Sequence, residues 1–180
     1  WRLSCGPGVL ADIGHHAAAL GTRALLIGGE TALSVTADTI HGALSAQGVT
    51  WHEEGGAHVE KTRPAVDALV AIGREQAVDL TIAVGSGRVG DAAKSVARAL
   101  NVPLITCPTL AASNGPGTSS GNIEGDLARS YWYRGPDVLI ADTEVIIRGG
   151  PRWLNSGMGD CLPFGGMWEM TERLGRTTGT

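Results

Sequence analysis

The sequence predicts an α/β fold in which a parallel, doubly wound sheet is covered by helices on both faces. Short apolar runs typical of buried strands alternate with longer segments whose apolar residues recur every three to four positions. Such alternation indicates parallel strand pairing with right-handed helical crossovers. Glycine supplies 27 of the 180 residues, and this excess indicates many tight turns and close approaches of the backbone to a ligand.

Four helices are expected before the last strand, each from apolar residues at helical spacing. They cover Val9–Leu20, Ser34–Gln47, a segment that begins near Thr62, and Val89–Leu100. Gly21 and Gly48 occupy the position favoured just past a helix end. Thr62 is a plausible N-cap, with Pro64 in the first turn behind it. The fourth helix has the most regular apolar face of the chain.

Five apolar runs between these helices are expected to form strands. They are Arg23–Gly28, Val49–His52, Asp79–Val84, Val102–Cys107 and Asp137–Asp142. The apolar runs fall far short of the roughly 20 residues that span a bilayer. We therefore expect no membrane association.

The pattern changes after Asp142. Pro151–Ser156 and Cys161–Leu174 have helical spacing with no strand between them. We therefore expect an α/β domain over residues 1–149 and the beginning of a helical domain over residues 150–180. The last expected helix runs close to Thr180 and the first residue is not methionine, so we expect the chain to be a fragment of a longer protein.

Charge and cysteine content narrow the class of protein. The formal net charge is -4, and the 14 lysines and arginines are scattered rather than gathered in a stripe, which argues against a nucleic-acid partner. Cys5, Cys107 and Cys161 are far apart and form no C-x-x-C pair. This usage favours a reducing compartment, and we expect a cytoplasmic protein.

A glycine-rich turn joins the third apolar strand to the most regular helix. It reads Gly85-Ser86-Gly87-Arg88-Val-Gly-Asp91-Ala-Ala-Lys94. Backbone N–H groups and the helix dipole at such a turn favour an anion. The turn fits G-x-G-x-x-G, but Pro103–Ala112 lacks the acid that a standard Rossmann fingerprint has about 20 residues on, so we reject that fingerprint.

Other interpretations of this turn stay open at this stage. The glycines can serve a tight turn alone, and Asp91 is stabilised by the helix dipole with or without a ligand. Lys94 is either a functional cation or a solvated helix residue.

Three motifs in order resemble one family. The turn at residues 85–94 is similar to G-G-G-x-x-x-D-x-A-K, and residues 108–114 (Pro-Thr-Leu-Ala-Ala-Ser-Asn) are similar to P-T-x-x-S-T-D. Residues 136–142 (Pro-Asp-Val-Leu-Ile-Ala-Asp), then Pro151-Arg152 and Gly157-Met-Gly-Asp160, resemble P-D-x-V-I-V-D, P-x-R and G-I-G-D. Together they resemble the iron- or zinc-dependent alcohol dehydrogenases of the dehydroquinate-synthase-like fold, nearest to the glycerol dehydrogenase branch.

The resemblance implies an NAD- or NADP-dependent oxidoreductase that acts on a small polyol or alcohol with a divalent metal, Zn or Fe. It implies that residues 1–149 are the α/β dinucleotide-binding domain and that residues 150–180 begin the helical metal-binding domain. It also leads us to expect a homo-oligomer. The implied cofactor-binding residues are Gly85, Ser86, Gly87, Arg88, Asp91, Thr109, Ser113, Thr118 and Glu30. Asn114 and Lys94 are the candidate catalytic residues, and Asp160 is the candidate metal ligand.

The sequence departs from the family pattern in three places. All five histidines precede residue 59, whereas the family takes two metal ligands from histidines after G-x-G-D, and a catalytic zinc normally has three protein ligands. Asn114 replaces an aspartate near the substrate. Gly28-Gly29-Glu30 offers an acid one position late for the selection of NAD over NADP, so either cofactor stays open.

The departures keep two other function classes open. One is a lyase or cyclase of the dehydroquinate synthase type, which uses NAD and a metal on a sugar phosphate. The other is a nucleotide-binding or regulatory module without catalysis, which stays open because the two histidines are missing.

Overall fold

A six-stranded parallel sheet forms the centre of the computed structural model, which describes residues 1–56, 59–123, 130–132 and 134–163. The strand order is β1-β8-β5-β4-β2-β3, and every neighbouring pair is parallel. The strands are β1 (Arg2–Gly6), β2 (Arg23–Gly28), β3 (Thr50–Gly55), β4 (Leu80–Val84), β5 (Leu104–Cys107) and β8 (Val138–Asp142). The predicted doubly wound parallel sheet is confirmed.

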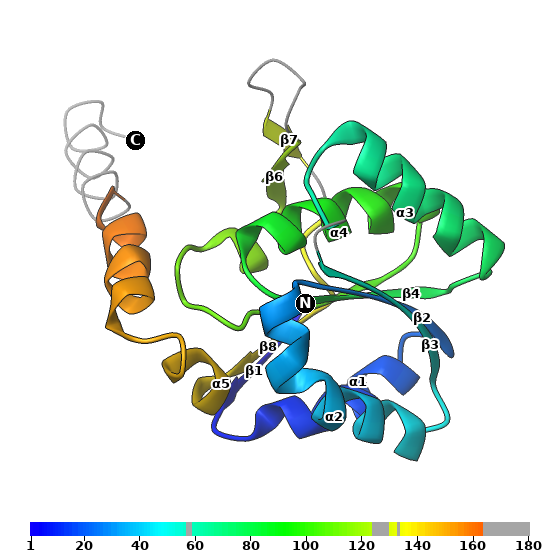
Figure 1. Cartoon of the computed structure of the whole chain (residues 1–180), viewed down its shortest axis with the longest axis horizontal. Helices are drawn as coiled ribbons and strands as arrows, with labels where there is room; N and C mark the ends of the chain where they lie inside the picture. The colour runs from blue at the N-terminus through cyan, green and yellow to red at the C-terminus, as the bar shows by residue number, and fades with distance from the viewer. Residues whose placement is uncertain (57–58, 124–129, 133, 164–180) are drawn as a thin grey trace, which may run out of the picture.

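Helices cover both faces of this sheet (Figure 1). Their bounds are η1 (Val9–Asp12), α1 (Ile13–Ala18), α2 (Glu30–Ala46), α3 (Arg63–Glu75), α4 (Gly87–Leu100), η3 (Gly115–Gly117) and α5 (Thr143–Ile147). One face carries α1 and α2, and the opposite face carries α3 and α4. Alternate side chains of β2 enter the two cores, with Leu26 packing toward the α1–α2 side and Leu25 toward the α3–α4 side.

The predicted first helix, Val9–Leu20, is wrong as a single helix. It forms the 3-10 turn η1 followed by the short helix α1, which ends at Ala18. Gly21 does not adopt a positive φ. A Cβ there would overlap the carboxylate of Asp79, which accepts hydrogen bonds from the backbone N–H groups of Thr22 and Arg23 at 2.9 and 2.8 Å. Glycine is thus needed for this close approach rather than for a helix cap.

The second predicted helix and strand exist, but their predicted bounds differ from the observed ones by a few residues. Helix α2 begins at Glu30, four residues before the predicted Ser34, and β3 extends from Thr50 to Gly55. Gly48 has a φ of 70°, as expected for the residue that ends a helix. The predicted N-cap at Thr62 is confirmed, since its hydroxyl accepts the N–H of Ala65 at 3.4 Å.

Five elements lie outside the predicted pattern, and one of them is the 3-10 helix η3. The strand β1 forms one edge of the sheet, and the helix α5 follows β8 directly. The antiparallel pair β6 (Ser120–Asn122) and β7 (Ser130–Trp132) projects beyond the α3–α4 layer (Figure 1).

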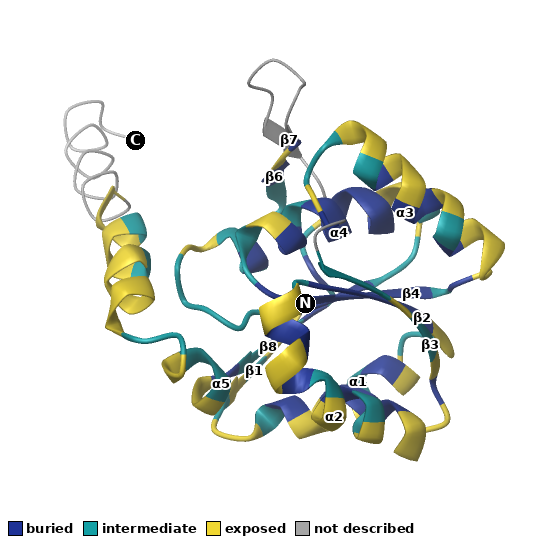
Figure 2. Cartoon of the chain, viewed as in Figure 1, coloured by how far each residue is buried: buried dark blue, intermediate teal, exposed yellow. Residues whose placement is uncertain are grey.

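A helix over residues 151–163 stands apart from the sheet. It confirms the helix predicted at Pro151–Ser156, whereas most of the predicted helix at Cys161–Leu174 lies outside the described residues. Figure 2 shows that this helix is mostly exposed. Its large apolar side chains Trp153, Leu154, Met158 and Leu162 are 40%, 36%, 64% and 76% exposed. No helix in the described part of the chain is long and apolar enough to cross a membrane.

Candidate functional site

The direction in which the chain adds strands to the sheet reverses between the neighbouring strands β2 and β4. After β2 the chain passes through α2 to β3 at one edge, and after β4 it passes through α4 toward β5 on the other side. Ligands of open α/β sheets bind at the carboxyl ends of strands where the direction reverses. Gly29 and Val84 meet at this point, since the N–H of Gly29 donates to the carbonyl of Val84 at 3.2 Å.

The predicted glycine turn lies at this reversal. Gly85 has a φ of 145°, and a Cβ there would lie 3.1 Å from Cγ2 of Val89, so the turn favours glycine at this position. Ser86 and Gly29 are the N-caps of α4 and α2, and neither helix has a side-chain hydrogen bond at its cap. The first backbone N–H groups of both helices are therefore free of side-chain caps beside the crevice.

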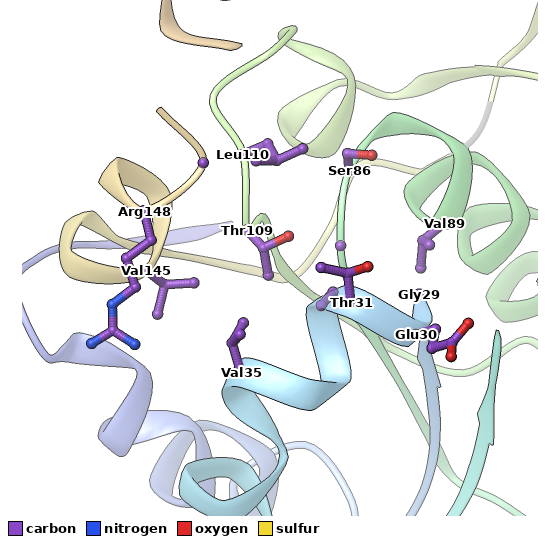
Figure 3. A pocket seen from close by; sticks show the side chains of 13 residues that line it. Gly29, Glu30, Thr31, Val35, Ser86, Val89, Thr109, Leu110, Val145 and Arg148 are labelled. Atoms are coloured by element: carbon purple, nitrogen blue, oxygen red, sulfur yellow. The ribbon is translucent and has the colours of Figure 1, made fainter. Parts of the chain in front are cut away.

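A cavity of about 320 Å³ opens between these two helix starts (Figure 3). Figure 3 shows Thr31 and Val35 on α2, Ser86 at the start of α4, Val89 on α4, and Thr109 on the loop after β5 arranged around it. Of the predicted cofactor-binding residues, the cavity is lined by Glu30, Gly85, Ser86 and Thr109. Gly87 and Arg88 lie in the adjoining first turn of α4, where Arg88 is exposed.

The far wall of this cavity comes from α5 and was missed by the sequence analysis. Val145, Arg148 and Gly149 line it, and Figure 3 shows the side chain of Val145 directed toward the α2 side. The signal that could have revealed α5 is Asp142, whose carboxylate caps the helix by accepting the N–H groups of Glu144 and Val145 at 2.9 and 3.4 Å.

A second cavity, of about 660 Å³, is lined by residues of the loop after β5 and of the 151–163 helix. The predicted residues Ser113 and Asn114 line it, together with Leu154, Met158 and Cys161. Most of its lining is apolar. The loop over residues 109–114 therefore touches the first cavity at Thr109 and the second at Ser113 and Asn114.

Three contacts fasten the 151–163 helix to this loop. Gly157 lies so close to Ala111 that a Cβ would overlap the carbonyl oxygen of Ala111. The hydroxyl of Ser156 donates to the carbonyl of Ala112 at 3.1 Å. The N–H of Asn114 donates to the carboxylate of Asp160 at 2.9 Å.

The remaining predicted residues, Asp91, Thr118 and Lys94, line neither of these two cavities. Asp91 is half-buried and accepts the N–H of Asn122 at 3.3 Å. Thr118 accepts a hydrogen bond from the ammonium of Lys94 at 3.3 Å. Lys94 itself is only 1% exposed, so a solvated surface position is excluded for it.

The described residues do not make a metal centre. Asp160 stands at the predicted ligand position, but the described part of the chain holds no cluster of three or more His, Cys, Asp or Glu side chains. His41 pairs with Glu53 at 2.6 Å and stacks on Trp51 near β3. One carboxylate falls short of the three protein ligands of a catalytic zinc, so the described residues do not by themselves complete such a site.

The fold and the turn define a class: open α/β proteins with a glycine turn and an uncapped helix start at the reversal of a parallel sheet. Residues 2–143 match the family model for iron-containing alcohol dehydrogenase. The chain belongs to the iron-containing alcohol dehydrogenase family.

Curated relatives agree with this assignment. The chain is 30% identical over 164 residues to a glycolaldehyde reductase of Halobacterium salinarum, covering 87% of this chain and 44% of the relative. It is 33% identical over 181 aligned positions to a glycerol-1-phosphate dehydrogenase [NAD(P)+] of Methanothrix thermoacetophila, covering 96% and 50%. The chain thus spans about half the length of these relatives.

Solved structures share the fold. A glycerol dehydrogenase of Schizosaccharomyces pombe matches with a TM-score of 0.79 at 27% identity, covering 89% of this chain and 41% of that one. A probable glycerol dehydrogenase of Sinorhizobium meliloti matches with a TM-score of 0.80 at 21% identity, covering 89% and 44%.

Proposed function

We propose that this chain supplies the dinucleotide-binding half of an NAD(P)-dependent, metal-dependent oxidoreductase that acts on a small polyol or alcohol. The observation that carries the proposal is the uncapped start of α4 behind Gly85, which borders a cavity of about 320 Å³ at the reversal of the sheet. Relatives named glycerol dehydrogenase, glycolaldehyde reductase and glycerol-1-phosphate dehydrogenase support a substrate of this size.

The backbone of the turn is suited to hold the diphosphate. N–H groups at a helix start and the helix dipole favour an anion, and Gly87 has no side chain to keep a phosphate away from them. Arg88 is exposed in the same turn and adds positive charge. We assign diphosphate binding to the segment Gly85–Arg88.

The loop over residues 109–114 is suited to align the two reactants. Thr109 borders the first cavity, and Ser113 and Asn114 border the second. A dinucleotide that extends along this loop would have its nicotinamide beside a substrate in the second cavity, which is the arrangement that hydride transfer needs. We assign cofactor contact to Thr109 and Ser113, and substrate contact to Asn114.

The metal remains a prediction that rests on family membership. A bound zinc or iron ion would polarise the alcohol oxygen of the substrate. Asp160 is the proposed ligand from this chain, because its carboxylate lies beside Asn114 at the rim of the second cavity.

The domain division is also a proposal. The exposed apolar side chains of the 151–163 helix support a helical region that begins at residue 150 and packs over them. A cytoplasmic location and a homo-oligomeric state stay predictions as well. Cysteine usage supports the first, since the cysteines within the described residues, Cys5, Cys107 and Cys161, are free thiols.

A phosphorylated polyol is a second candidate substrate. The relative that covers 96% of the chain is a glycerol-1-phosphate dehydrogenase. Asn114 is uncharged and would not repel an anionic substrate, whereas an aspartate there would. Rates of NADH formation by the full-length polypeptide with glycerol and with glycerol 1-phosphate separate the two candidates.

Calorimetric titration tests the binding proposal directly. A Cβ on Gly87 would lie 3.6 Å from the hydroxyl of Ser113, an ordinary contact, so Gly87→Ala should fold normally and yet obstruct the diphosphate. We expect NAD or NADP affinity to fall about tenfold or more, as the loss of a charge-assisted hydrogen bond implies. Gly42→Ala is the matched control, because a Cβ on Gly42 of α2 meets nothing within 4 Å. Equal affinity in Gly87→Ala, or no dinucleotide binding by the wild type, would refute the proposal.

A further inference from the structure

Lys94 is a charged side chain inside the protein. It lies on α4, is 1% exposed, and is among the largest fully buried side chains of the described residues. Its ammonium group donates to the carbonyls of Gly115 and Ser120 at 2.6 and 2.7 Å and to the hydroxyl of Thr118 at 3.3 Å. All three acceptors belong to one short segment, residues 115–120.

The charge of Lys94 is balanced locally. Burying an unpaired ammonium group is unfavourable, but an oxygen of Asp91 lies 3.8 Å from the ammonium, one turn earlier on α4. Burial lowers the pKa of Lys94, and the negative charge of Asp91 opposes that effect. The carboxylate of Asp91 also accepts the N–H of Asn122 at 3.3 Å, so the pair holds both ends of the segment that runs into β6.

Residues 115–120, which accept the hydrogen bonds of Lys94, lie next to the start of α4. A Cβ on Gly115 would lie 3.8 Å from the Cα of Gly87 and 3.3 Å from the hydroxyl oxygen of Ser113. The N–H of Gly115 donates to that hydroxyl at 3.3 Å. A displacement of Gly115 would therefore move Ser113 relative to the turn that we assign to the diphosphate.

The carbonyls of this segment point toward buried donors. Lys94 binds those of Gly115 and Ser120, and Thr106 of β5 donates to the carbonyl of Pro116 at 3.1 Å. Replacing Lys94 would remove the ammonium donor that joins the carbonyls of Gly115 and Ser120 to α4, and these carbonyls would keep only donors from Thr118, within the segment itself. Lys94 itself is not among the residues that line the cavity of Figure 3.

We propose that Lys94 is a positioning residue: it holds residues 113–118 against the first turn of α4, in the arrangement in which that turn and Ser113 bind a dinucleotide. The expected effect on dinucleotide binding rests on the proposed function. The claim that Lys94 holds this segment rests only on the hydrogen bonds described above. Lys94 acts through the segment and not by contact with the cofactor.

Hydrogen exchange on the ligand-free protein tests the structural half. The N–H groups of Gly117 and Thr118 donate to the carbonyls of Asn114 and Gly115, and in Lys94→Met we expect them to exchange at least about tenfold faster than in the wild type. Val96→Ala is the matched control, because Val96 lies two residues further along α4, is fully buried, and packs into the α3–α4 core. It should lower the Tm while leaving exchange at Gly117 and Thr118 relatively unchanged.

Calorimetry with NAD and NADP on the same variants tests the functional half. We expect Lys94→Met to weaken binding about tenfold or more, Lys94→Gln to fall between it and the wild type because an amide still donates, and Val96→Ala to bind normally. If Lys94→Met does not fold, Lys94→Gln is used in both measurements. Unchanged exchange at Gly117 and Thr118 in the Lys94 variant would overturn the inference. An unchanged dinucleotide affinity of that variant would also overturn it, provided that the wild type binds the dinucleotide. A wild type that binds no dinucleotide refutes the proposed function instead, while the exchange data still decide whether Lys94 holds the segment.

Discussion

The carboxylate of Asp142 accepts the backbone N–H of Leu10 at 3.0 Å, across 132 residues of sequence. The same side chain accepts the N–H of Gly8 at 3.2 Å and caps α5 through Glu144 and Val145. It is 4% exposed. A single carboxylate thus joins the loop after β1 to the helix that forms the far wall of the cavity in Figure 3.

Asp142→Asn should destabilise the protein by about 1–3 kcal/mol, because the amide replaces one acceptor oxygen with a donor that faces backbone N–H groups. Chemical denaturation followed by the tryptophan signal measures the change. Asp38→Asn, on the exposed side of α2, is the control and should change the unfolding free energy little. An Asp142→Asn protein as stable as the wild type would show that the joint between β1 and α5 is dispensable.

The stabilisation by Asp142 should depend on pH in one direction. Burial alone would raise its pKa, but hydrogen bonds from Leu10, Val145, Glu144 and Gly8 hold the pKa below the ordinary value. A carboxyl whose folded pKa is lowered stabilises the fold above its unfolded pKa of about 3.9 and loses that effect as the pH falls through the folded value. The difference in unfolding free energy between the wild type and Asp142→Asn should therefore be constant near neutral pH and shrink below about pH 4. A difference that grows on acidification would contradict this assignment.

Two buried threonines on neighbouring strands should respond oppositely to replacement by valine. Thr81 on β4 is fully buried, and its hydroxyl has no hydrogen-bond partner among the described residues. Thr106 on β5 is 2% exposed and donates to the carbonyl of Pro116 at 3.1 Å. We expect Thr81→Val to stabilise the fold by about 1 kcal/mol and Thr106→Val to destabilise it by about 1–2 kcal/mol. Thermal unfolding of the two variants side by side gives the answer, and a loss of stability in Thr81→Val would mean that its hydroxyl has a partner.

The centre of the sheet could be predicted because its signal is local. Strands β2, β4 and β5 are buried on both faces and appear as apolar runs, and the apolar face of α4 repeats at helical spacing. The edge strand β1 lacks such a run, since Arg2, Leu3 and Cys5 are exposed and only pairing with β8 makes this segment a strand. Helix α5, of five residues, is too short for a periodic pattern.

One part of the candidate site, the glycine turn, could be predicted because its signal is also local in the sequence. The turn at Gly85 is contiguous in sequence, and so it could be found from its order between strand and helix. The environment of Lys94 could not, because it lies outside the apolar stripe of α4 and becomes buried only when residues 115–120 fold over it. Arg148 likewise reaches the cavity only through the pairing that brings β8 beside β5.

Two glycines in the 151–163 helix provide the sharpest test of how that helix is attached. A Cβ on Gly157 would overlap the carbonyl oxygen of Ala111, whereas one on Gly159 would meet nothing within 4 Å. Alanine favours a helix over glycine by about 0.5–1 kcal/mol, so Gly159→Ala should slow hydrogen exchange in the helix.

Gly157→Ala gains the same propensity but must push the helix away from the loop over residues 109–114. Its exchange should therefore accelerate, because the hydrogen bonds from Ser156 to Ala112 and from Asn114 to Asp160 depend on that contact. Mass spectrometry of peptides from residues 151–163 compares the two variants. If both glycine replacements slowed exchange equally, the loop would not be what holds Asp160 beside Asn114, and the proposed metal ligand would lose its fixed position at the rim of the second cavity.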